Sequence, residues 1–191
     1  MVEKALIIHD KRSDPDDIAT TLAEIGYDSI RIIASGENLI RHTEEFEPNV
    51  VIFDIYRLKE SMMTKISNLS QATPLPIIMF VDESSDDIIS DVVRCGISAY
   101  VVDGYQRHRV QDIINIAKAR FVENLRLLNE LEEAKSALDS RKLIDRAKGI
   151  VMKQKSCDEQ AAYNLIRKMA MDKNKRIVDV ASQLVELADL I

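Results

Sequence analysis

Carboxylates are the first candidates for chemistry in this sequence. Asp10 and Asp54 each follow a short apolar run, and Asp82 and Asp103 follow two later runs. If these runs are parallel strands, their carboxyl ends lie at one edge of a sheet, where such folds place their functional loops. We therefore take Asp10 and Asp54 as residues of an acidic pocket. The alternative is that Asp10 and Asp54 merely lie at the ends of strands and have no functional role.

Basic side chains form a second group near the other end. Residues 1–105 hold 9 basic and 19 acidic side chains, whereas residues 141–191 hold 11 and 7. A basic surface suits the phosphates of a folded RNA, although a solvated charged face is the alternative. The candidate RNA-binding residues are Arg141, Lys142, Arg146, Lys148, Lys153, Arg167, Lys168, Lys173, Asn174, Lys175 and Arg176.

The distribution of charge in this region favours RNA over DNA. A DNA-reading last helix should present basic or amide side chains, but residues 177–191 contain no Lys or Arg and include Asp179, Glu186 and Asp189. Tyr163 has two interpretations, a core aromatic or a platform on which an unpaired base stacks.

Several other kinds of chemistry have little support. The two cysteines, Cys95 and Cys157, lie far apart, and the three histidines are scattered without metal-ligand spacing. We expect no enzyme activity and no cofactor. No run approaches the roughly 20 apolar residues of a membrane span, so we expect a soluble, cytoplasmic protein.

The acidic half must be positioned by alternating strands and helices. Apolar β-rich runs alternate with helix-length amphipathic stretches, as in βα units around a parallel sheet. This pattern predicts an α/β, flavodoxin-like domain with five parallel strands, at residues 5–8, 29–33, 50–53, 77–81 and 99–102.

A long helix should follow this domain. Residues 110–138 lack Pro and Gly and carry a heptad pattern in which seven of nine core positions are apolar. We predict a coiled coil between two chains, with Asn124 and Lys135 as polar core positions that fix its register. A fifth domain helix with a solvated linker is the alternative. The predicted dimer contacts are Ile114, Phe121, Leu128, Leu131 and Leu138.

The basic region should be all-helical. Residues 139–191 contain three amphipathic segments and no strand pattern. Asn174, in the turn before the last segment, is predicted to cap the third helix.

Residues 3–105 resemble the receiver domain of two-component response regulators. In that family Asp54 would accept a phosphoryl group and Asp10 would help to hold Mg²⁺. The family's hydroxyl residue after the fourth strand falls on Val81, and its lysine after the fifth falls on Asp103. The resemblance therefore implies a pseudo-receiver with impaired phosphorylation, although Mg²⁺ at Asp10 and Asp54 stays open.

Residues 139–190 resemble the ANTAR domain. The likeness lies in SRKLIDRAKGIVM (140–152), AAYNLIR (161–167), AMDKN (170–174) and VDVA (178–181). ANTAR proteins bind paired hairpins in leader transcripts and prevent terminator formation, so that RNA polymerase reads through. The segments MFVD (79–82) and GISAYVVDG (96–104) resemble the nitrate-responsive NasT group, in which a nitrate-binding partner holds the regulator inactive.

These observations predict three parts, namely a receiver-like domain (1–105), a coiled-coil linker helix (106–138) and an ANTAR RNA-binding domain (139–191). We expect a homodimeric antiterminator of nitrate or nitrite assimilation genes that is sequestered by a ligand-sensing partner. The alternatives are a phosphorylation-activated antiterminator with another inducer and a protein-interaction module with no RNA role.

Overall fold

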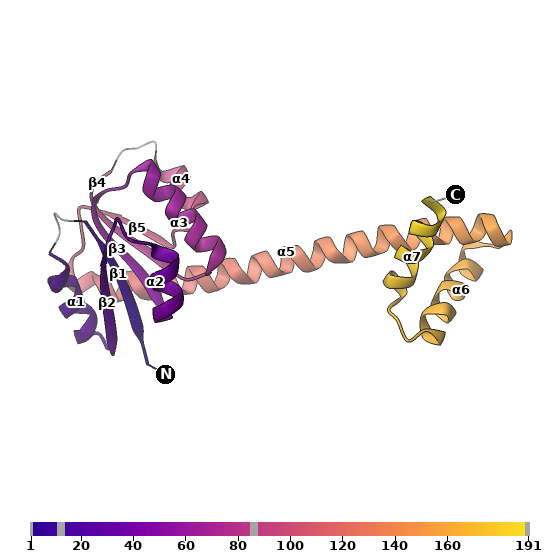
Figure 1. The fold of residues 1–191 in the computed structure, drawn as a ribbon, viewed down its shortest axis with the longest axis horizontal. Helices are drawn as coiled ribbons and strands as arrows, with labels where there is room; N and C mark the ends of the chain where they lie inside the picture. Colours follow the sequence, from indigo (N-terminus) through magenta and orange to yellow (C-terminus); the bar gives the residue numbers. More distant parts are fainter. Residues whose placement is uncertain (1, 11–13, 85–87, 190–191) are drawn as a thin grey trace. The chain divides into compact units, whose positions relative to one another are not determined.

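The N-terminal part of the computed structural model is a parallel sheet between two layers of helices (Figure 1). The structure describes residues 2–10, 14–84 and 88–189. The strand order is β2-β1-β3-β4-β5, which is the predicted flavodoxin-like order. The strands are β1 (Lys4–His9), β2 (Ser29–Ala34), β3 (Val50–Arg57), β4 (Ile77–Glu83) and β5 (Ala99–Val102).

Helices cover both faces of this sheet because alternate strand residues point to opposite faces. Leu6, Phe53 and Met79 belong to one core together with residues of α2, α3 and α4. Ile7, Ile52 and Phe80 belong to a second core with α1 and α5. The helices are α1 (Pro15–Glu24), α2 (Leu39–Phe46), α3 (Glu60–Ala72), α4 (Ile89–Arg94) and α5 (Arg107–Lys155).

The third strand is longer than the sequence pattern predicted. Asp54 lies inside β3, beside His9 of β1 and Phe80 of β4 in the strand register. The ladder continues past the apolar run because backbone hydrogen bonds, not side chains, define a strand. Asp54 is consequently held in the sheet itself, and only 7% of its surface is exposed.

Helix α5 contains both the predicted linker helix and the first helix of the C-terminal module. It runs unbroken for 49 residues, and the chain divides within it into two units, residues 1–125 and 126–191. Ile114 is 3% exposed and packs in the second core of the sheet. The prediction of Ile114 as a dimer contact was therefore wrong, because the receiver-like domain already buries that turn of the helix.

The C-terminal unit consists of the end of α5 with α6 (Glu159–Asp172) and α7 (Ile177–Asp189). Its core combines apolar residues of all three helices: Ala147, Val151, Ala162, Ile166, Ala170, Val180, Ala181 and Val185. The Asp158 side chain caps α6 by accepting a hydrogen bond of 2.7 Å from the Ala161 N–H.

Candidate functional site

Helix α6 carries an exposed stripe directly beside its buried one. Ala162, Ile166 and Ala170 are buried at a spacing of four residues, so the residues that follow them also share a face. These are Tyr163, Arg167 and Met171, all exposed. Tyr163 is 37% exposed and Met171 is 71% exposed. Tyr163 is thus a surface aromatic and not a core residue.

The stripe forms one wall of an open pocket of about 360 Å³. The turn between α6 and α7 forms the opposite wall with Asn174, Lys175 and Ile177. The pocket lining thus combines the aromatic residue Tyr163 with Arg167, Asn174 and Lys175. The last three are predicted RNA-binding residues.

Asn174 shapes this pocket through its backbone. Its φ is 49°, in the left-handed region that Asn tolerates better than most residues. The Asn174 N–H donates to the Met171 carbonyl oxygen (3.1 Å), and the Lys175 N–H donates to that of Ala170 (2.9 Å). Asn174 therefore ends α6 and does not cap α7 as predicted, and this turn brings Lys175 beside Arg167 in the pocket lining.

The remaining predicted cations lie away from this pocket. Arg141, Lys142, Arg146 and Lys153 are exposed on α5, and Lys168 and Lys173 are exposed on or after α6. None of them lines the pocket. We call Arg167, Asn174 and Lys175 the pocket group, and Arg141, Lys142, Arg146 and Lys153 the α5 group. Lys168 and Lys173 belong to neither group.

Three predicted RNA contacts are engaged in ion pairs. Lys142 Nζ lies 3.5 Å from Asp139 Oδ1, and both side chains stay exposed. Lys148 Nζ lies 2.6 Å from both Asp145 Oδ1 and Glu159 Oε1, and its side chain is 15% exposed. These contacts raise the pKa of Lys148 and lower that of Asp145. Lys148 thus joins α5 to α6. Arg176 holds Asp179 through two hydrogen bonds of 2.9 and 3.1 Å, but its side chain stays 80% exposed.

The acidic pocket of the N-terminal unit surrounds Asp54. It has a volume of about 310 Å³ and its described lining contains no Lys or Arg. Asp103 takes a left-handed φ of 67° at the end of β5, and its carboxylate stands where the receiver resemblance placed a lysine. The other acidic lining residues are Asp14, Asp17 and Asp82.

Asp10 does not line this pocket. Its Oδ2 accepts a hydrogen bond of 2.8 Å from the Tyr56 N–H, and Asp10 lines a different hollow with Arg57 and Lys59. Within the described residues, no three His, Cys, Asp or Glu side chains are arranged as ligands of one metal ion. The two carboxylates that the resemblance assigned to Mg²⁺ thus face different hollows.

No described helix combines the length and the apolarity that a bilayer crossing requires.

The N-terminal and C-terminal units resemble different known proteins. Residues 132–185 match the family model of the ANTAR domain. A response regulator receiver domain protein (CheY-like) from Methanospirillum hungatei has the same N-terminal fold, with a TM-score of 0.54 and 18% identity over 65% of this chain and 99% of its own.

Two curated relatives extend the comparison. The transcriptional regulatory protein PdtaR of Mycobacterium tuberculosis is 26% identical over 183 residues, which cover 96% of this chain and 89% of the relative. The nitrate regulatory protein of Klebsiella oxytoca is 35% identical over 80 residues, which cover 42% of this chain and 20% of that protein.

Proposed function

Since the chain is an ANTAR-domain response regulator with a receiver-type N-terminal fold, we propose that it binds hairpins in leader transcripts and prevents termination of transcription. The main support for this proposal is the open pocket between α6 and the turn that leads to α7. Tyr163 offers a ring face for an unpaired base, and Arg167 and Lys175 lie where they can hold the adjoining phosphates.

The α5 group extends the same interaction along the hairpin stem. Arg141 and Lys142 are exposed on one turn of α5 and Arg146 on the next, where they can contact backbone phosphates. In this arrangement the pocket group reads the loop and the α5 group supplies affinity that does not depend on base sequence.

The signal enters through the receiver-like domain by contact with another protein. The Asp54 pocket lacks a cation in its described lining, which disfavours a stable aspartyl phosphate. The similarity to a nitrate regulatory protein supports nitrate or nitrite assimilation genes as the target. A ligand-sensing partner then sequesters the regulator, which works as a homodimer inside the cell.

The direct test is binding to a two-hairpin RNA taken from the leader of the operon that adjoins the gene. Removing the ring in Tyr163→Ala should raise Kd about tenfold, since stacking on one base contributes about 1–3 kcal/mol. Tyr163→Phe keeps the ring and serves as the matched control, with affinity close to that of the unmodified protein. Fluorescence anisotropy at several salt concentrations measures both.

The charged residues give the second arm of this test. Arg167→Gln and Lys175→Gln should weaken binding and reduce the slope of log affinity against log salt, by about 0.7–0.9 for each phosphate that the protein no longer neutralises. Lys148→Gln should change affinity less than either, because its ammonium group is already paired. If the RNA affinity does not change with salt, nor in Tyr163→Ala, Arg167→Gln or Lys175→Gln, the result would support a protein-interaction role instead.

A further inference from the structure

A second hollow lies on the receiver-like unit, between α3 and the segment that joins β2 to α2. It consists of two adjoining parts of about 180 and 320 Å³ that share Gly36 and Lys65 in their lining. Together they reach the size of a small-molecule site. The Asp54 pocket shares none of the lining residues of either part.

One end of this hollow is strongly basic within an acidic domain. Arg57, Lys59 and Lys65 line it, and they are three of only 9 basic residues in positions 1–105. All three are exposed, and none takes part in the ion pairs found among the described residues. Asp10 is the one acidic residue in the described lining of this end, so three basic side chains face one carboxylate. This excess of positive charge stabilises an anion bound there.

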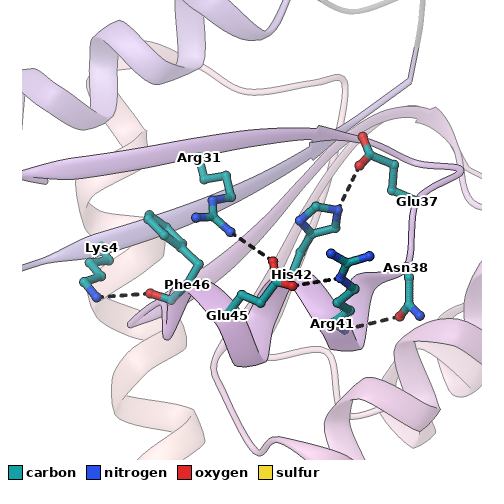
Figure 2. A network of polar contacts seen from close by, with 8 residues as sticks. All are labelled: Lys4, Arg31, Glu37, Asn38, Arg41, His42, Glu45 and Phe46. Carbon is teal, nitrogen blue, oxygen red and sulfur yellow. Dashed lines mark hydrogen bonds and ion pairs between the residues drawn. The ribbon is translucent and has the colours of Figure 1, made fainter.

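The acidic groups at the same hollow are held by other donors. Glu37 accepts from the Ala34 N–H (2.9 Å), and its other oxygen lies 2.8 Å from His42 Nε2. These contacts, the backbone one foremost, lower the pKa of Glu37. Asp10 is likewise held by the Tyr56 N–H. Figure 2 shows Glu37 directed to His42 on α2.

Hydrogen-bond donors supplement the three cations. Lys59 occupies the N-cap position of α3 and makes no side-chain capping bond. The Met62 N–H donates to the Lys59 carbonyl oxygen (2.9 Å), so the Glu60 and Ser61 amides of the first turn are the ones that a cap side chain leaves to an anion. Ser61, in that first turn, and Ser35 add hydroxyl groups to the lining. The basic end therefore offers both charge and directed donors to an oxyanion.

The other end of the hollow is less polar. Leu39 and Ile40 of α2 line it, and Asn38 is turned to the Arg41 N–H, which it caps at 3.2 Å (Figure 2). A purely inorganic ion would leave this part empty.

We propose that this hollow binds a small organic anion, with its phosphate or carboxylate group among Arg57, Lys59 and Lys65 and its less polar body against Leu39 and Ile40. Such a ligand would reach α2 and α3 at a place separate from Asp54. It would give the receiver-like domain a chemical input of its own, independent of whether the C-terminal unit binds RNA.

Calorimetric titration of the full chain with phenyl phosphate, benzoate and inorganic phosphate tests this proposal. We expect saturable binding of one of the two organic anions, and whichever binds more tightly identifies the head group. Inorganic phosphate should bind more weakly than phenyl phosphate if the latter is preferred. Equal binding of the two phosphates would overturn the assignment of the less polar end.

Variants locate the site. Arg57→Gln and Lys65→Gln should each weaken binding about five- to tenfold, since a charge-assisted hydrogen bond at a partly exposed site contributes roughly 1–1.4 kcal/mol. Arg109→Gln removes an exposed arginine of α5 and should leave binding unchanged. In NMR spectra of the unmodified chain, the backbone amides of Ser61 and Lys65 should shift with ligand.

Absence of saturable binding by both organic anions would overturn the proposal. So would an equal loss of affinity in Arg109→Gln, because binding would then follow net charge and not this hollow. RNA affinity should be unchanged in Arg57→Gln and Lys65→Gln, which keeps this test separate from that of the proposed function.

Discussion

Asp103 adds a negative charge to the lining of the Asp54 pocket, at the position where the receiver resemblance places a lysine. An acyl phosphate on Asp54 would carry about two negative charges in place of the single charge of the carboxylate, in a pocket already lined by Asp14, Asp17, Asp82 and Asp103. At 7% exposure, Asp54 has little water available to screen that charge. The physical expectation is an acidic pocket that does not hold a phosphate.

Incubation with acetyl phosphate and Mg²⁺ tests this expectation. We predict no gain of mass on the intact chain, because the described lining offers no cation to stabilise the phosphorylated form. Asp54→Asn is the control, since it removes the acceptor oxygen with little change of shape. A stoichiometric gain in the unmodified chain that is lost in Asp54→Asn would restore phosphorylation as the input.

Tyr105 gives a prediction on pH. Its hydroxyl donates to Asp17 Oδ2, and burial, this hydrogen bond and the charges of Asp17 and Asp54 raise its pKa above the ordinary value of 10.0. The folded state thus favours the neutral phenol. Its contribution to stability is complete below about pH 10 and is lost as the pH rises through the folded pKa.

Denaturant unfolding of the unmodified chain and of Tyr105→Phe, between about pH 8 and pH 11, measures this contribution. The free energy of unfolding of the unmodified chain should fall more steeply above about pH 10 than that of the variant. Parallel curves would show that Tyr105 does not discriminate between its two protonation states.

Among the elements, α5 stands out for the apolar surface that it leaves exposed. Leu128, Leu131 and Leu138 are 60%, 59% and 58% exposed. They occupy the heptad positions predicted for a coil, whereas the earlier heptad positions up to Ala117 pack against the sheet. The apolar seam that remains for a second chain therefore begins at Phe121.

Sedimentation of seam variants tests the coil. Leu128→Glu with Leu131→Glu places four charges in the core of a dimeric coil and should convert dimers into monomers at low micromolar concentration, since buried unpaired charges are costly. Val122→Glu is the matched control, because Val122 is 64% exposed but lies off the seam. A monomeric unmodified chain would exclude the constitutive coil.

At the scale of the whole molecule, the chain has separate cores and opposite charges. The cores of the sheet end at Ala117 and the core of the C-terminal unit begins with α5 residues near Ala147. No residue between these two is buried, and this stretch is described throughout. We therefore expect the two units to unfold independently.

Ile166→Ala tests this independence. Ile166 is fully buried in the C-terminal core, and its truncation should cost that unit about 2–5 kcal/mol. Hydrogen exchange should accelerate in α6 and α7 and stay unchanged in β3 and β4. Leu165→Ala removes a neighbouring side chain that is 41% exposed and should alter neither unit. Faster exchange in β3 would show that the units are coupled.

Much of the fold could be predicted from the sequence because local patterns carry it. The five apolar runs became the five strands, and the three amphipathic segments of residues 139–191 became three helices around one core. The same patterns also located Asp54 and the basic region. Hydrophobic periodicity and charge are properties of neighbouring residues, so the order of residues alone determines them.

Only the tertiary structure decided which residues act together. Asp10 and Asp54 look equivalent in the sequence, yet they line different hollows. Lys148 looks like its basic neighbours, yet Glu159 of the next helix holds it. Ile114 fits the heptad but is buried by the sheet. Contacts between elements also placed the Asp54 carboxylate in an acidic pocket, and Tyr163, Arg167 and Lys175 in the pocket between α6 and the turn that follows it. Each of these outcomes depends on such contacts, which the periodicity along a single element does not encode.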